Sequence, residues 1–435
     1  MKQPLPSSEL FKTMPFDNVM RCIHCGMCAD ACPTYRELGM EQDSPRGRLY
    51  IMRGLWEGDL QPEPAVIAPL SRCLDCRACE TVCPSLVPYG ELIEKTRGVL
   101  NSKTKKGLGE RFLRGFLLKR VLASTSWLVW FSRLSRFYQA SGLARFLAPL
   151  LPKRLRQSHR LMPTFAGASF KRKSAEKEEA QKQKGAPQVG LFTGCVMDIA
   201  EHQIHQATVE VLEALGFAVR VPQDQGCCGA LQVHQGEREM PRQLARRNAA
   251  AFAGLDRLVV NAAGCGAQLK EYAHLFSELG EEKEEDWQKF RAKVVDILAL
   301  LAERQDWPRG LSWQTAAVTV LYDAPCHLIH AQGIDAGPRK VLAELPGVTL
   351  VALAEASRCC GAAGIYNLQH PELADAILDR KLDDIQHSLE QHPEAAILVT
   401  GNPGCLFQLR HGVRKRILPL RVIHPVELIA ERMAL

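Results

Sequence analysis

The sequence predicts a multidomain protein in which an α-helical domain precedes an α/β domain made of two cysteine-rich repeats. Three observations support this fold class. The N-terminal region contains one dense cysteine motif twice, the middle of the chain is basic with apolar residues at helical spacing, and the C-terminal half alternates short apolar runs with helical patterns. A chain of 435 residues is also too long to fold around a single ordinary hydrophobic core. We expect the helical domain over residues 1–100, a connector over 101–186, and α/β repeats over 187–310 and 311–435.

Cysteine usage indicates a metal or redox protein of a reducing compartment. The chain has 16 cysteines, and its N-terminus, "MKQPLPSSEL", lacks the apolar core of a signal peptide. Clustered cysteines in a cytoplasmic protein bind metals or carry out redox chemistry, whereas disulfide scaffolds belong to secreted chains. The longest strongly apolar stretch, residues 121–131, has about half of the roughly 20 residues that a membrane-spanning helix needs. We expect a cytoplasmic protein without a transmembrane span.

The N-terminal motif has the spacing of an iron-sulfur site. "CIHCGMCADACP" at 22–33 and "CLDCRACETVCP" at 73–84 both read C-x2-C-x2-C-x3-C-P, the run with which bacterial ferredoxins hold their clusters. Zinc also binds four thiolates from C-x2-C pairs, but its sites rarely add a third such step and a Cys-Pro ending. We therefore predict a two-cluster ferredoxin-like domain, with a turn and a helix between the motifs.

The spacing also assigns the ligands of the two [4Fe-4S] clusters. In two-cluster ferredoxins the fourth cysteine of each run ligates the cluster of the other run. One predicted ligand set is Cys22, Cys25, Cys28 and Cys83. The other predicted set is Cys73, Cys76, Cys79 and Cys32. Between the motifs, Arg46 and Arg48 either raise a cluster potential, dock a partner, or form ordinary ion pairs.

The connector is strongly basic. Residues 103–184 contain 20 Lys or Arg against 4 Asp or Glu. Residues 108–162 predict amphipathic helices, which either lie on the cytoplasmic face of a membrane or pack on the α/β domain or a partner subunit. Residues 170–187, "FKRKSAEKEEAQKQKGAP", predict a solvated linker. No helix-turn-helix or zinc-finger pattern is present, so we expect no nucleic-acid partner.

The C-terminal half repeats one order of cysteines: a single cysteine, a pair followed by glycine, and a single cysteine. The first half contains Cys195, Cys227, Cys228 and Cys265, and the second contains Cys326, Cys359, Cys360 and Cys405. The single cysteines follow apolar runs, and ligands of parallel sheets gather at the carboxyl ends of strands. We predict a Rossmann-like fold for each repeat, with a cysteine-lined crevice in each half. An iron-sulfur cluster, zinc and a redox dithiol all remain open as the occupant.

A two-cluster ferredoxin unit joined to two Cys-Cys-Gly repeats resembles a known family. Its members are iron-sulfur subunits of glycolate oxidase, anaerobic glycerol-3-phosphate dehydrogenase and lactate utilisation complexes, together with heterodisulfide reductase subunits. The stretches "CIHCGMCADACPTYRELG", "SPRGRLYIMRGL" and "GNPGC" look most like the glycolate oxidase branch. The resemblance implies an electron-transfer subunit that accepts electrons from flavin-containing dehydrogenase subunits and passes them towards a membrane quinone.

One departure from the family separates two functions. In the heterodisulfide reductase branch each repeat ends in C-x2-C, whereas Cys265 is followed by "GAQ" and Cys405 by "LFQ". We therefore prefer electron transfer as the function, and chemistry on a thiol or disulfide substrate is the alternative. The chain also has no G-x-G-x-x-G after a predicted strand, so we expect FAD on partner subunits only.

Overall fold

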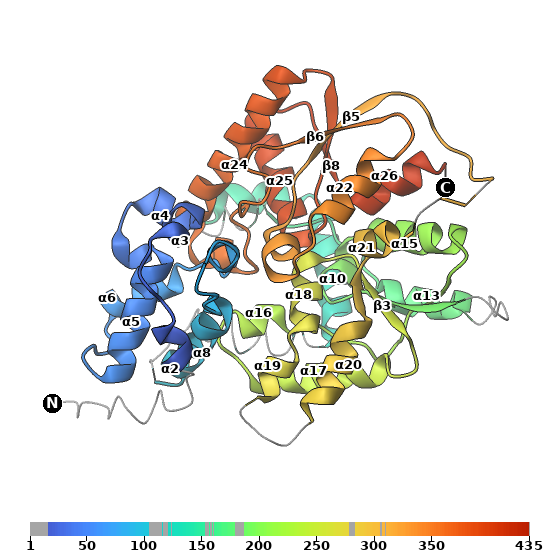
Figure 1. Cartoon of the computed structure of the whole chain (residues 1–435). Helices are drawn as coiled ribbons and strands as arrows, with labels where there is room; N and C mark the ends of the chain where they lie inside the picture. Colours follow the sequence, from blue (N-terminus) through green and yellow to red (C-terminus); the bar gives the residue numbers. More distant parts are fainter. Residues whose placement is uncertain are drawn as a thin grey trace.

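The N-terminal part of the chain folds into a unit of short helices at one side of the molecule (Figure 1). The computed structural model describes residues 16–103, 115, 121–122, 124–152, 156, 159, 161–178, 187–277, 283–304, 307–308 and 310–434. The N-terminal elements are α2 (Phe16–Met20), α3 (Met27–Ala31), α4 (Pro33–Leu38), η1 (Glu41–Asp43), α5 (Pro45–Glu57), α6 (Pro64–Ser71), α7 (Ala78–Thr81) and α8 (Tyr89–Lys103). All regular elements described in this unit are helices, as the sequence predicts.

Helix α5 is the helix expected between the two motifs. The side chain of Ser44 caps its N-terminus by accepting a hydrogen bond from the Gly47 amide at 2.9 Å, and a proline occupies the first turn. Gly58 ends the helix in the left-handed region, at φ 90°. The apolar side chains of Leu49 and Met52 point into the core of the unit. This helix therefore supports both cysteine motifs from the inside.

The connector contains helices with an apolar exposed face. Its elements are α10 (Thr125–Ala140), α11 (Leu143–Leu147), η3 (Ala148–Leu150) and α13 (Phe170–Glu178). The predicted amphipathic segment 108–162 is covered only in part, because residues 108–114, 116–120, 123, 153–155, 157–158 and 160 lie outside the described residues. Among the helices that the structure describes, none has the length and apolar character needed to cross a bilayer.

The predicted solvated linker is wrong over its first half, where the chain forms α13. Phe170 is buried and packs with Leu191 and Val221 of the first repeat. Lys171 is also buried, and its ammonium group donates a hydrogen bond to the carbonyl of Gln225 at 2.7 Å. These two contacts anchor a segment whose composition resembles that of a linker. The remaining predicted linker residues, 179–186, lie outside the described residues.

Two α/β repeats form the rest of the molecule, each on a four-stranded parallel sheet (Figure 1). The first contains β1 (Gln188–Phe192), α14 (Met197–Ala200), α15 (His202–Ala214), β2 (Ala218–Arg220), α16 (Ala230–Val233), α17 (Glu239–Ala251), β3 (Arg257–Val260), α18 (Ala263–Lys270), α19 (Ala273–Phe276), α20 (Glu284–Lys293), β4 (Val294–Asp296) and α21 (Ile297–Ala302). The second contains β5 (Val318–Tyr322), the π-helical turn η4 (His327–Ala331), α22 (Ala336–Ala343), β6 (Val348–Ala352), α23 (Tyr366–Gln369), α24 (Pro371–Gln391), β7 (Ala395–Val399), α25 (Pro403–Arg416), β8 (Arg421–Ile423) and α26 (Pro425–Arg432).

The two sheets have the same topology. Their strand orders are β2-β1-β3-β4 and β6-β5-β7-β8, so the first and third strands of each repeat lie side by side at the centre. All strand pairs are parallel, and the central ones pair Leu191 with Val259 and Leu321 with Leu398. The predicted α/β repeats with parallel sheets are confirmed. The repeated order of cysteines thus corresponds to a repeated order of strands.

The two repeats exchange their terminal helices. Helix α26 of the second repeat packs on α15 of the first, and α21 of the first packs on α22 of the second. The guanidinium of Arg410 pairs with the carboxylate of Glu201 at 2.6 Å across this interface. One hydrophobic core includes buried residues from both sheets. The repeats therefore form a single folded body.

Candidate functional site

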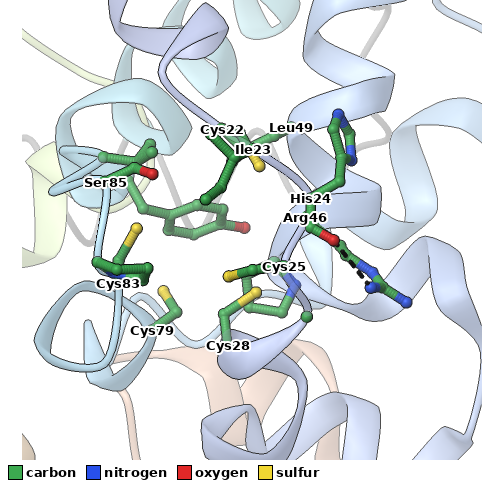
Figure 2. Close-up of a pocket in the computed structure, with 15 residues that line it drawn as sticks. Cys22, Ile23, His24, Cys25, Cys28, Arg46, Leu49, Cys79, Cys83 and Ser85 are labelled. Atoms are coloured by element: carbon green, nitrogen blue, oxygen red, sulfur yellow. Dashed lines mark hydrogen bonds between the residues drawn. The ribbon is translucent and has the colours of Figure 1, made fainter.

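The first predicted ligand set lies near the surface of the N-terminal unit (Figure 2). A cavity of about 30 Å³ is lined by five cysteines: Cys22, Cys25, Cys28, Cys79 and Cys83. Their sulfur atoms surround one space in Figure 2, and Cys25 is exposed to solvent. The turn that places Cys25 and Cys28 contains Gly26 at φ 86°, a conformation that favours glycine. The four cysteines predicted for one cluster are thus brought together.

The second predicted set is buried beside the first. A cavity of about 20 Å³ is lined by Cys32, Cys73, Cys76 and Cys79. All four of these cysteines are buried. Because Cys79 lines both cavities, the two sets adjoin. One set therefore faces the surface and the other faces the interior.

Hydrogen-bond donors surround the sulfurs of the second set. The amide of Asp75 donates to the sulfur of Cys73 at 3.4 Å. The guanidinium of Arg48, which is 1% exposed, lies 3.7 Å from the sulfur of Cys32 and pairs with the carboxylate of Asp43 at 3.3 Å. Arg48 thus forms the ion pair considered from the sequence. It also places a positive charge beside a cysteine of the second set. Arg46, in contrast, forms a surface ion pair with Glu41 at 2.6 Å.

The donor chemistry of both sets fits a [4Fe-4S] cluster. Thiolate sulfur is the ligand that iron-sulfur clusters prefer, and amide and guanidinium donors stabilise the negative charge of such a centre. Burial raises the pKa of Cys76 and of Cys79 well above the usual thiol value. A metal or cluster at this site would be held by the deprotonated thiolates, so its binding would be coupled to proton release.

All eight cysteines of the C-terminal repeats line one shared cavity of about 350 Å³. The sequence predicted a separate crevice in each half, and this prediction is wrong. Cys195 and Cys265 follow the central strands β1 and β3, whereas Cys326 and Cys405 follow β5 and β7. The carboxyl ends of both sheets therefore face the same space, between repeats that also contact each other through α15 and α26 and through α21 and α22. No single repeat shows this, so the sequence pattern could not reveal it.

The sulfur atoms in this cavity lie in close pairs. The distances are 3.4 Å between Cys195 and Cys227, 3.3 Å between Cys228 and Cys265, and 3.2 Å between Cys360 and Cys405. These distances exceed a disulfide bond of about 2.05 Å, so the thiols are free. The hydrogen bonds shared with Cys195 and Cys228 lower the pKa of Cys227, whereas sulfur hydrogen bonds and burial raise the pKa of Cys195 and of Cys228. Closely spaced cysteine sulfurs are suited to binding a soft metal ion or cluster.

The buried ferredoxin-type set borders the shared cavity. Cys76 packs in one hydrophobic cluster with Cys326 and Cys359 of the second repeat. Leu74, between two predicted ligands, lines the shared cavity. The three cysteine sites therefore follow one another from the exposed Cys25 to the interior of the repeats.

A group of charged residues that the sequence did not reveal joins the N-terminal unit to the first repeat. His234 Nδ1 lies 3.0 Å from the carboxylates of both Asp75 and Glu94. Arg77 pairs with Glu94 at 3.5 Å and with Glu271 of the first repeat. The carboxylates raise the pKa of His234 to about 9 against the opposing effect of burial. No motif marks these residues, because their meeting depends on how the units dock.

The fold and the sites define a class of protein: a ferredoxin-type dicluster unit followed by a pair of cysteine-rich repeats. Residues 18–87 match the family described as "4Fe-4S dicluster domain". Residues 189–270 and 320–410 match the family described as "Cysteine-rich domain". The two matches cover the N-terminal unit and both repeats.

Curated relatives identify the family within this class. The chain is 33% identical to the probable glycolate oxidase iron-sulfur subunit of Bacillus subtilis, over 98% of this chain and 96% of the relative. It is 31% identical to the glycolate oxidase iron-sulfur subunit of Escherichia coli, over 93% of each chain. It is 27% identical to a fumarate reductase (CoM/CoB) subunit of Methanothermobacter marburgensis, over 94% of this chain and 71% of the relative. The chain belongs to the family of glycolate oxidase iron-sulfur subunits, which confirms the resemblance seen in its motifs. It is therefore an iron-sulfur subunit associated with an oxidoreductase.

Proposed function

We propose that this chain is the electron-transfer subunit of a flavin-dependent 2-hydroxyacid dehydrogenase complex, with glycolate as the substrate of the complex. One observation carries the proposal: the cysteines form three adjoining sites that run from the exposed Cys25 to the shared cavity. Iron-sulfur clusters held there would supply one-electron transfer. The similarity to glycolate oxidase iron-sulfur subunits supports the choice of substrate.

The proposed ligands are those assigned from the motif spacing. Cys22, Cys25, Cys28 and Cys83 would hold one [4Fe-4S] cluster, and Cys73, Cys76, Cys79 and Cys32 the other. The cysteines of the shared cavity would hold a further iron-sulfur cluster or clusters, zinc, or act as a redox dithiol. The gathering of cysteine sulfurs around each small cavity supports the ferredoxin-type assignment.

The flavin-containing partner is proposed to dock beside the first cysteine set. Large apolar side chains surround this site and are strongly exposed: Ile23 at 69%, Met27 at 58% and Leu86 at 74%. Exposed apolar groups around a cofactor site are typical of an interface for another protein. FAD would belong to that partner, where the 2-hydroxy acid is oxidised.

The connector is proposed to contact a membrane that contains the quinone acceptor. Trp130 and Phe137 of α10 are 57% and 65% exposed on one helical face. The sequence has no acidic residue between Glu110 and Glu176, so this region favours an anionic lipid surface. Replacing both Trp130 and Phe137 with serine should reduce sedimentation with phosphatidylglycerol vesicles by at least tenfold. Unchanged sedimentation would contradict membrane contact through this face.

Metal content and one substitution test the central proposal. Protein purified without oxygen should contain about eight iron atoms per chain if only the ferredoxin-type sites are filled, and more if the shared cavity holds iron. The variant Cys25→Ala should abolish electron transfer from the flavin partner to quinone, while the substrate still reduces the flavin. Normal transfer by this variant, or stoichiometric zinc with little iron, would overturn the proposal.

Chemistry on a thiol or disulfide substrate is the alternative. The similarity to a chain named as part of a fumarate reductase (CoM/CoB) and the free thiols of the cavity favour it. An iron-sulfur subunit of a lactate or glycerol-3-phosphate dehydrogenase would share the proposed sites. Assays with glycolate, lactate and glycerol 3-phosphate on the assembled complex distinguish these substrates.

A further inference from the structure

The lining of the shared cavity combines two kinds of side chain. The first is the set of eight cysteines that follow the strands of both repeats. The second is a set of apolar side chains of the connector and of the repeats: Leu128, Phe131, Phe165, Leu231, Ile365, Leu368 and Phe407. Leu128 and Phe165 belong to the same hydrophobic cluster as Cys195 and Cys227. A ligand that contacts these apolar side chains would therefore lie next to the cysteines.

The described part of the lining disfavours a strongly charged ligand. Among the described residues, no lysine, arginine, aspartate or glutamate lines the cavity. A carboxylate or a charged thiol would lose its hydration there without a matching cation, because His234 is already paired with two carboxylates. Polar atoms are few, and two of them, Nε2 of His327 and Oδ1 of Asn261, are buried with no hydrogen-bond partner in the described part of the chain. Such a lining is suited to an apolar molecule that carries one or two hydrogen-bonding groups.

Helix α10 separates this cavity from the proposed membrane face. Its side chains Leu128 and Phe131 line the cavity. Trp130, which points away from these two residues on the helix, is 57% exposed. The apolar surface continues beyond the helix, because Phe146 and Leu150 are each 78% exposed. Helix α10 therefore contributes both to the cavity lining and to the proposed membrane face.

We propose that the apolar side chains of the shared cavity bind a lipid-soluble quinone. This inference rests on the proposed function and names the place where the acceptor binds. Oxidation of a 2-hydroxy acid to a 2-oxo acid releases two electrons and two protons, and a quinone takes up the same number to become a quinol. The hydrocarbon tail would contact Leu128, Phe131 and Phe165. A carbonyl oxygen of the ring would accept a hydrogen bond from a polar side chain of the lining, such as His327 or Asn402.

Photolabelling tests the site without relying on turnover. The purified full chain, with its clusters intact and in detergent, is irradiated with an azidoquinone that carries a decyl tail, and the labelled peptides are identified by mass spectrometry. We expect labels in the peptides that contain Phe131, Phe165 or Ile365, and protection by excess decylubiquinone. Labels confined to other peptides, or labels that excess decylubiquinone does not reduce, would overturn the proposal.

Cavity-filling variants provide the second measurement. Leu368 is 38% exposed, so Leu368→Trp adds volume at the cavity with little demand on the buried core. We expect at least tenfold less protected labelling in this variant, with unchanged iron content and circular dichroism. Leu231→Trp fills the cavity from α16 and should act in the same way. The matched control is Lys289→Trp on α20, an exposed position outside the cavity, which should label like the wild type. Wild-type labelling in both folded cavity variants would overturn the proposal.

The two proposals fail in different ways. If the chain is not an electron-transfer subunit, substrate and the flavin partner will not reduce its clusters, whatever the labelling shows. If only the quinone site is wrong, the flavin partner will still reduce the clusters in Leu368→Trp, and decylubiquinone reduction will match the wild-type rate. Under the proposal, Leu368→Trp retains cluster reduction and loses quinone reduction by at least tenfold.

Discussion

His234 lies between two carboxylates at the junction of the N-terminal unit and the first repeat. Its imidazole faces Asp75 and Glu94, and its backbone carbonyl accepts a hydrogen bond from Arg97 at 2.8 Å. Burial disfavours the imidazolium, but the hydrogen bonds and charges of the two carboxylates raise its pKa from 6.5 to about 9. A shift of this size corresponds to about 3 kcal/mol in favour of the protonated form. The ion pairs of His234 with Asp75 and Glu94 thus require a protonated imidazole.

The pH dependence of stability follows from this shift. Because the folded-state pKa is the higher one, the contribution of His234 is fully present below pH 6.5 and is lost as the pH rises through about 9. We predict that the melting temperature of the wild type falls between pH 7 and pH 9.5, and that His234→Gln flattens this fall. The control His387→Gln removes an exposed histidine and should leave the fall unchanged. Equal pH profiles for wild type and His234→Gln, measured by differential scanning calorimetry, would contradict this role.

The sequence identified the cysteines of the sites but not the residues around them. Cysteine spacing is local, so the ferredoxin-type sets could be assigned before any contact was known. The environment of Arg48 depends on Thr34, Asp43 and Pro69, which approach it only in the folded unit. The same holds for Asp75, Glu94 and His234, which come from two different units. Sequence pattern therefore predicts which cysteines come together better than it predicts the charges that surround them.

At the level of elements, helix α8 and the first repeat touch backbone to backbone. A Cβ atom on Gly98 would lie 2.9 Å from the carbonyl oxygen of Gly236. Gly236 itself has φ 76°, a conformation that favours glycine. Two glycines thus let the N-terminal unit dock closely enough for the ion pairs of His234 to form.

A single methyl group should loosen this docking. Gly98→Ala places its Cβ against a backbone atom, which cannot move aside as a side chain would. We predict a loss of about 1–3 kcal/mol in the free energy of unfolding, together with faster proteolysis between the N-terminal unit and the repeats. Gly254→Ala is the matched control, since a Cβ there meets no atom within 4 Å. Equal denaturation midpoints for Gly98→Ala and the wild type would show that the contact is not tight.

The spacing of apolar residues predicted helices and strands well where an element buries a regular series of apolar side chains. The parallel sheets were expected from apolar runs that alternate with helical patterns, and a helix was expected between the two cysteine motifs. Helix α13 was missed because its charged composition outweighed one apolar residue, Phe170, and because Lys171 finds a buried carbonyl acceptor. Composition describes the average environment of a segment, whereas two anchoring contacts decided its structure.

At the level of the whole molecule, the two repeats depend on each other. Each supplies a terminal helix to the other, and both contribute buried residues to one core. Hydrogen bonds cross the interface at the cavity, where the amide of Gly264 donates to the side-chain oxygen of Asn402 and the amide of Ala263 donates to the carbonyl of Gly401, both at 3.1 Å. The shared cavity exists only because both sheets present their carboxyl ends to it. The sequence repeat predicted two similar units but could not show that neither is complete alone.

Separating the repeats should therefore abolish folding as well as the cavity. The fragment 187–310 would lack α26, which covers α15, and would expose part of the common core to water. We predict that this fragment and the fragment 311–435 each show no cooperative thermal transition and bind a hydrophobic dye, whereas their co-expression yields a one-to-one complex with a cooperative transition. The fragment 187–435, which keeps both repeats, is the control and should unfold cooperatively. A cooperative transition in either isolated fragment would show that the exchanged helices are dispensable, and each repeat would then have to be treated as an independent binding unit.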